Sequence, residues 1–176
     1  GAMFAKPPTT RKNVPKIVFT FFYDKNGNVI KSGTKGTRSV YDWGQETEAY
    51  DLVLNIHDYP EMLKLLNFIN RRDGTNYNNI YIIYYRGSEN FINRHKDKTT
   101  TFKKGASICL LNLLLEGKAR TFNVSEGKKK KKKILASLTM ENNEAVVLSS
   151  QANDDYYHEL VKCILSESGL RVSITL

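Results

Sequence analysis

Cysteine and histidine are scarce in this sequence, and their placement argues against two kinds of small protein. The 176 residues include two cysteines, Cys109 and Cys163, and neither belongs to a CxxC pair. The three histidines stand at no metal-ligand spacing from them, so the pattern argues against a disulfide scaffold and against a structural zinc site. We expect both thiols to be small apolar core residues in a reducing intracellular compartment, whether nucleus, cytoplasm or an organelle.

Long apolar runs are also missing. The longest, Ala106–Leu115, is interrupted by Ser107 and Asn112 and falls short of the roughly 18 residues that a membrane-spanning helix needs. The sequence has no GxxxxGK[ST], GxGxxG or HExxH motif either. We therefore predict no membrane partner, no metal and no cofactor.

Acidic residues are nearly absent from one stretch, and this is where the net charge of +9 originates. Residues 98–133 hold eleven lysines and arginines against two glutamates, which leaves +9, while the rest of the chain is neutral. Such a concentrated field attracts polyanions over about a Debye length, roughly 8 Å at physiological salt. Nucleic acid is the polyanion that we expect first.

The first 15 residues are expected to form a disordered basic arm. They contain three of the four prolines and have no hydrophobic periodicity. Gly1-Ala2-Met3 is typical of the remnant of a cleaved expression tag.

Strand-like alternation and tight turns recur along residues 16–176, which we expect to form a single α+β domain. β-branched and aromatic residues dominate the strongest segments, and Lys25-Asn26-Gly27-Asn28 has the chemistry of a hairpin turn. Strands are expected at Lys16–Asp24, Val29–Ile30, Ser39–Trp43, Ala49–Ile56, Asn79–Tyr85, Ala106–Glu116, Ala119–Val124, Lys130–Met140, Ala145–Ser149 and Arg171–Leu176.

Two amphipathic helices are expected, one closing each half of the domain. Asp58-Tyr59-Pro60-Glu61 has capping-box spacing and opens a helix that ends at Gly74. A second begins near Asn153 and runs through His158 to Gly169, and Ser88–His95 is read as a short helix. The fold class is therefore two strand-rich antiparallel units with β-β-β-β-α order, pseudo-repeats of about residues 16–97 and 98–176.

Six consecutive lysines are the most prominent motif. Their functional interpretation is phosphate binding, in which each neutralised phosphate releases counterions. A solvated arm that protects a sheet edge and a nuclear localisation signal are the alternatives. The run comprises Lys128, Lys129, Lys130, Lys131, Lys132 and Lys133.

Basic residues alternate with aromatic ones elsewhere, which is typical of single-strand binding. Residues i and i+2 of a strand share a face, so Lys118, Arg120 and Phe122 would line one surface. On such a surface bases stack on rings while cations bind phosphates. Besides the lysine run, the predicted nucleic-acid-binding residues are Lys103, Lys104, Arg86, Lys118, Arg120, Phe122, Tyr81 and Tyr85.

Residues 102–168 resemble one repeat of the Whirly-type single-stranded-DNA-binding proteins, whose wider fold group includes transcriptional-cofactor-type binders and RNA-binding relatives. The resemblance is carried by Phe102-Lys103-Lys104-Gly105, an apolar strand, Gly117-Lys118-Ala119-Arg120, the basic hairpin, Glu144–Leu148 and the closing helix. It implies a Whirly-like fold, single-stranded DNA or RNA as the partner, and a homo-oligomer. The favoured function is thus non-enzymatic, largely sequence-independent binding of single-stranded nucleic acid.

Two alternatives come from other functional classes. A metal-dependent nuclease would use Asp97, Glu116 and Lys118, in which two acids hold a metal and the lysine stabilises charge. A protein-interaction module would instead self-associate through the apolar strand Ala106–Leu115.

Overall fold

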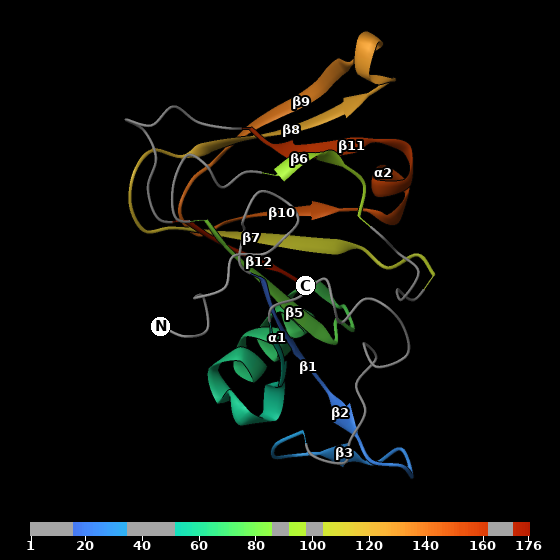
Figure 1. Cartoon of the computed structure of the whole chain (residues 1–176), viewed down its shortest axis with the longest axis vertical. Coiled ribbons are helices and arrows are strands. Elements are labelled where there is room, and N and C mark those ends of the chain that lie inside the picture. Colours follow the sequence, from blue (N-terminus) through green and yellow to red (C-terminus); the bar gives the residue numbers. More distant parts are fainter. Residues whose placement is uncertain (1–15, 35–51, 86–91, 98–103, 162–170) are drawn as a thin grey trace. The chain divides into compact units, whose positions relative to one another are not determined.

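The computed structural model describes residues 16–34, 52–85, 92–97, 104–161 and 171–176 (Figure 1). These residues fall into two compact units, the first made of residues 16–83 with 175–176 and the second of residues 84–174. Within the described ranges, no helix is long and apolar enough to cross a membrane. Each unit is α+β and rich in strands.

The first unit is organised around β1 (Lys16–Thr20), whose five residues are all buried. β1 pairs in parallel with β4 (Leu52–Asn55) and antiparallel with β5 (Asn79–Tyr85), so that Val18 lies between Val53 and Tyr81. Because successive side chains of β1 point to opposite faces and all are buried, both faces of the strand are covered, which explains the apolar run Ile17-Val18-Phe19. The sheet is mixed, which corrects the prediction of antiparallel strands alone.

The predicted turn at residues 24–28 is confirmed. It joins β2 (Phe22–Tyr23) to β3 (Val29–Ile30), and Gly27 has a φ of 82° that favours glycine. The Asp24 carboxylate accepts hydrogen bonds from the N–H groups of Asn28 and Asn26, both at 2.9 Å. These bonds, the one from Asn28 first, hold the pKa of Asp24 below its usual value.

The predicted first helix is confirmed in position but not in its cap. A 3-10 turn, η4 (Ile56–Asp58), leads into α1 (Pro60–Asp73), which buries Leu66 and Ile69 and ends at Gly74 in the left-handed conformation. Asp58 does not cap the helix, because its carboxylate accepts the N–H of Gly33 at 2.9 Å instead. The capping-box prediction is therefore wrong, since a contact distant in sequence competes for the same carboxylate.

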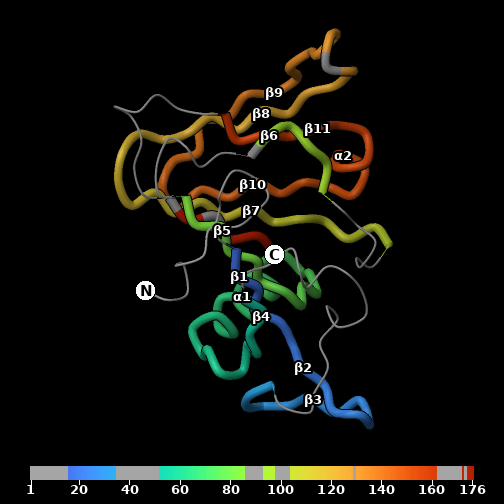
Figure 2. The backbone as a smooth tube through the Cα atoms, in the orientation of Figure 1, coloured from blue at the N-terminus to red at the C-terminus, as the bar shows by residue number. Residues whose placement is uncertain are grey.

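The second unit contains a four-stranded antiparallel sheet in the order β6-β11-β8-β9 (Figure 1, Figure 2). These strands are β6 (Ile92–His95), β11 (Tyr157–Leu160), β8 (Arg120–Glu126) and β9 (Lys133–Met140). β9 is the last strand of the sheet as described, and seven of its eight residues are exposed, among them Ile134, Leu135 and Leu138.

A second group of strands in this unit surrounds β7 (Ile108–Leu114). β7 lies between β10 (Glu144–Leu148) and β12 (Arg171–Thr175), so both of its edges are paired. The apolar strand proposed for self-association therefore offers no open edge. Its Ile108 packs in a buried cluster with Phe122, Met140 and Leu148, which joins β7 and β10 to β8 and β9. The buried Cys109 is an apolar core residue, as predicted.

Two predicted helical segments are strands. Residues 92–95 form β6, and α2 (Ser150–Asp155) ends at Tyr156, so that residues 157–160 form β11. The apolar spacing around Tyr157 and Leu160 fits a helix and a strand equally well over so few residues. Pairing with both β8 and β6 decides for the strand. The β-β-β-β-α repeat is therefore not confirmed, and Ser39–Trp43 lies outside the described residues.

Glycine is required at one turn beside the lysine run. Gly127 has a φ of 85°, and a Cβ there would lie 2.4 Å from the carbonyl oxygen of Lys131 at the end of η5 (Lys129–Lys131). At Gly74, φ is 65° but the space around a Cβ is open.

We therefore expect replacement by alanine to lower the free energy of unfolding by different amounts at Gly74 and Gly127. Gly74→Ala should lower the free energy of unfolding by about 1–2 kcal/mol, the cost of a left-handed alanine. Gly127→Ala should cost more, because the backbone of Lys131 must also move. Urea unfolding followed by circular dichroism measures both, and equal costs would contradict the clash at Gly127.

Candidate metal centre

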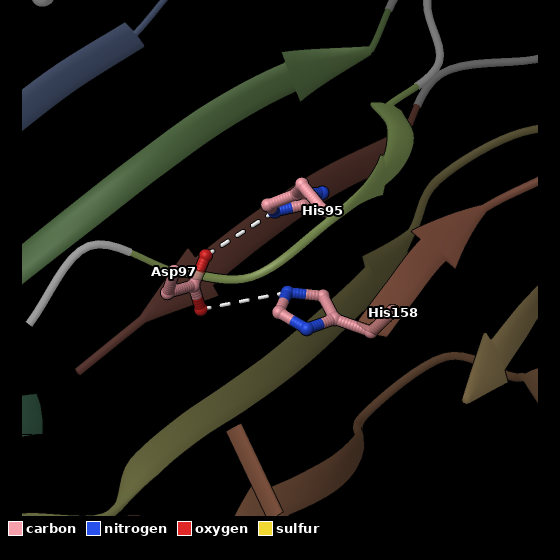
Figure 3. Close-up of side chains that lie close together, drawn as sticks. All are labelled: His95, Asp97 and His158. Carbon is pink, nitrogen blue, oxygen red and sulfur yellow. Dashed lines mark hydrogen bonds and ion pairs between the residues drawn. The ribbon is translucent and has the colours of Figure 1, made fainter. Parts of the chain in front are cut away.

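Three side chains with metal-binding atoms converge on one face of the β6–β11 sheet (Figure 3). His95 Nε2 lies 3.2 Å from Asp97 Oδ1, and His158 Nε2 lies 3.5 Å from Asp97 Oδ2. One donor atom of each residue lies within 4.8 Å of the others. Among the described residues, this is the group of three or more such side chains that could hold a metal ion.

Strand pairing brings the two histidines together although they are far apart in sequence. His158 in β11 is the direct antiparallel partner of His95 in β6, and paired residues point to the same face. Their ring centroids are 4.3 Å apart. Phe122 of β8 stacks on the His158 ring, with centroids 5.6 Å apart and an interplanar angle of 27°, and so restricts its orientation.

Hydrogen bonding fixes which nitrogen of His95 faces the centre. Its Nδ1 lies 2.7 Å from the carbonyl oxygen of Asn93, and a carbonyl only accepts, so Nδ1 carries the hydrogen. In the neutral ring Nε2 is then an acceptor that faces a carboxylate oxygen. The lone pairs of His95 Nε2 and of the Asp97 oxygen repel each other unless a proton or a metal ion lies between the two atoms. A ring nitrogen anchored in this way is the usual second contact of a metal-binding histidine.

The centre is only partly buried. The side chains of Asp97, His95 and His158 are 24%, 20% and 7% exposed. Burial alone would raise the pKa of Asp97, but its hydrogen bonds to His158 and His95, together with their charges, outweigh burial and lower that pKa well below the usual range. Asp97 is therefore ionised at neutral pH, as a metal ligand must be.

These donors fit one divalent cation. One donor atom of each residue lies within 4.8 Å of the others, and two ligands about 2.1 Å from one metal ion are at most about 4.2 Å apart, so a small inward shift of the side chains would bring all three onto one ion. Two imidazoles and one carboxylate on one side of a metal leave its other positions open. This donor set is typical of non-haem Fe(II) oxygenases.

The predicted nucleic-acid-binding residues that the structure describes differ in their exposure. Tyr85, Arg120 and Phe122 are buried, so their side chains offer no face to a base or phosphate. The Arg120 guanidinium lies over the Tyr85 ring and donates to the carbonyl oxygen of Val161. Tyr81 is half-buried in the first unit, Lys104 and Lys118 are exposed outside the strands, and Arg86 and Lys103 lie outside the described residues.

The lysine run forms η5 and the start of β9. Lys128, Lys130, Lys131 and Lys133 are exposed, and Lys129 belongs to η5. Lys132 is also exposed, and it forms an ion pair with Glu159 at 2.5 Å. One of the six lysines therefore has a structural partner on β11.

The nuclease alternative also fails on geometry. Glu116 and Lys118 are exposed between β7 and β8 and do not belong to the cluster that contains Asp97. Neither His95 nor His158 was among the predicted site residues. The available signal was His95-x-Asp97, a spacing that puts both side chains on one face of an extended segment.

Comparisons with known proteins find a likeness in fold but none in sequence. No family model matches the sequence, and no curated protein is significantly similar to it. The crystal structure of IDO from Bacillus thuringiensis matches with a TM-score of 0.50 and 12% identity over 99% of this chain and 79% of that chain. The structure of OsALKBH1 matches with a TM-score of 0.50 and 10% identity over 97% of this chain and 82% of that chain.

At 12% and 10% identity, both neighbours show a likeness in fold alone, and neither is a Whirly-type structure. The Whirly-type resemblance is therefore wrong. Together with the His95–Asp97–His158 cluster, the likeness also overturns the prediction of a non-enzymatic protein that binds single-stranded DNA or RNA. The expected homo-oligomer stays a prediction.

Proposed function

We propose that His95, Asp97 and His158 bind one Fe(II) ion and that the protein is a non-haem iron oxygenase. The observation that carries the proposal is the convergence of two imidazoles and one carboxylate on one sheet face. The likeness in fold to the structures of IDO and OsALKBH1 supports it.

Each ligand has a distinct part in this centre. Asp97 supplies the negative charge, His95 presents Nε2 because Asn93 holds its Nδ1, and Phe122 restricts the His158 ring. The partial exposure of Asp97 and His95 leaves one side of the centre accessible to a substrate. When bound, the iron would supply the means to activate dioxygen for insertion into an organic substrate.

Metal content and dioxygen uptake test this function. Chelator-treated protein should take up one Fe(II) per chain under anaerobic conditions, measured by elemental analysis after desalting. The loaded protein should then consume dioxygen when 2-oxoglutarate is added, a co-substrate chosen because a 2-oxo acid can chelate a metal through two oxygens. His158→Ala should lose both properties.

His57→Ala is the matched control, because it removes the histidine of the first unit and leaves the cluster intact. Glu116→Gln should likewise bind iron normally. Failure of the wild-type protein to retain any divalent metal would overturn the proposal. Retention of metal by His158→Ala would show that the site lies elsewhere.

A further inference from the structure

We propose that α2 is a clamp that positions Asp97 for metal binding, and that Asn153 is its principal residue. The proposal rests on the metal function above and adds a positioning role for residues that do not touch the metal. It follows from the contacts between α2 and the segment that carries His95 and Asp97.

The Asn153 side chain pairs with the backbone of Asp97 through both of its polar atoms. The Asp97 N–H donates to Asn153 Oδ1 at 2.9 Å, and Asn153 Nδ2 donates to the Asp97 carbonyl oxygen at 3.1 Å. Asn153 is 2% exposed, so water does not compete for these bonds. A planar amide bound at two points fixes the position and the rotation of the peptide backbone at Asp97.

Asp97 needs this support because it lies beyond the end of β6. The pairing of β6 with β11 ends at His95 and His158, and Asp97 follows two residues later outside the strand. The sheet therefore fixes the two histidines but leaves the carboxylate ligand to other contacts.

Neighbouring residues reinforce the clamp. The Lys96 ammonium donates to the carbonyl oxygen of Asp154 in α2 and lies 4.8 Å from the centroid of the Tyr157 ring. Arg94 lies 4.1 Å from the same ring centroid and donates to Ser125 Oγ at 2.7 Å. The residues on either side of His95 are thus held from the face opposite the metal centre.

The helix α2 directly precedes the strand that carries His158, so it links two of the proposed metal ligands. The Ser149 side chain caps the helix by accepting the N–H of Ala152, and His158 follows the helix after three residues. Asn153 therefore ties the carboxylate ligand to the segment that leads into a histidine ligand. Partners of this kind typically contribute 10–100-fold to metal affinity.

The test compares metal affinity among variants of the full chain, with Co(II) as a spectroscopic substitute for iron. Asn153→Ala should weaken Co(II) binding 10–100-fold in a competition titration with a chelating dye and change the visible absorption of bound Co(II). Gln151→Ala, at an exposed position of the same helix, is the matched control and should bind as the wild type does. Lys96→Met, a milder change, should weaken binding severalfold.

The outcomes separate this proposal from the proposed function. No Co(II) or Fe(II) binding by the wild-type protein overturns the metal function itself. Wild-type affinity and spectrum in Asn153→Ala overturn the clamp alone, even if both the metal-free and the metal-bound forms melt at lower temperature. If Asn153→Ala does not fold, wild-type affinity in Lys96→Met overturns the clamp.

Discussion

Asp97→Asn should abolish metal binding while leaving the fold intact. Asp97 is the one carboxylate of the cluster, and its two oxygens face the two histidine rings at 3.2 and 3.5 Å. Asparagine keeps the shape of the side chain but removes the charge and replaces one oxygen with a hydrogen-bond donor. We expect affinity to fall by more than about 100-fold, beyond the upper end of the effect of outer partners.

Competition against a chelating dye measures this loss, and the far-ultraviolet circular dichroism spectrum checks the fold. Asp155→Asn is a suitable control, because Asp155 is an exposed acid on α2 outside the cluster. One equivalent of metal bound to Asp97→Asn at wild-type affinity would exclude Asp97 as a ligand.

Phe122→Ala should be the most destabilising of the single substitutions considered for this chain. Phe122 is 5% exposed and packs with Ile108, Met140 and Leu148, so its removal leaves a cavity between the strands of the second unit. A buried phenylalanine replaced by alanine typically costs about 3–5 kcal/mol. The His158 ring also loses its stacking partner, so metal affinity should fall as well.

Urea unfolding of metal-free protein gives the stability change, with Phe68→Ala for comparison. Phe68 is 53% exposed on α1, and surface substitutions usually change stability by about 0.5 kcal/mol or less. If both substitutions cost the same, Phe122 is a surface ring, as the single-strand-binding prediction required.

Local chemistry was sufficient to predict much of the fold. The buried run of β1, the turn at Gly27, the end of α1 at Gly74 and the strands β5, β7, β8 and β10 all follow from side chains near one another in sequence. Their signals are alternation, glycine in a left-handed turn and apolar spacing, which depend little on the rest of the molecule.

The metal centre could not be predicted in the same way. His95 and His158 meet only because β6 pairs with β11, and both segments were read as helices. Four residues of each strand are too few for periodicity to decide, so tertiary pairing determines the structure. Because His158 was placed on a helix, the sequence offered no third metal-binding side chain to accompany His95 and Asp97.

The prediction of nucleic-acid binding depended too strongly on the number of basic residues. Arg120 and Phe122 alternate as residues of a binding strand would, yet their shared face is the interior of the second unit. The alternation correctly placed Arg120 and Phe122 on one face of the strand. That face is buried, whereas the prediction required it to be exposed to solvent. Strands separated by basic loops also occur in unrelated folds. The same pattern therefore led to the wrong prediction of a Whirly-like fold.

The lysines beside β9 affect the tendency of the chain to self-associate at high protein concentration. An outer strand with exposed Ile134, Leu135 and Leu138 is a template on which a second molecule can add a strand. Like charges at the start of β9 keep two such edges apart, and salt screens that repulsion within a few ångströms at 1 M. We therefore expect added salt to promote self-association, with β9 as the strand that pairs.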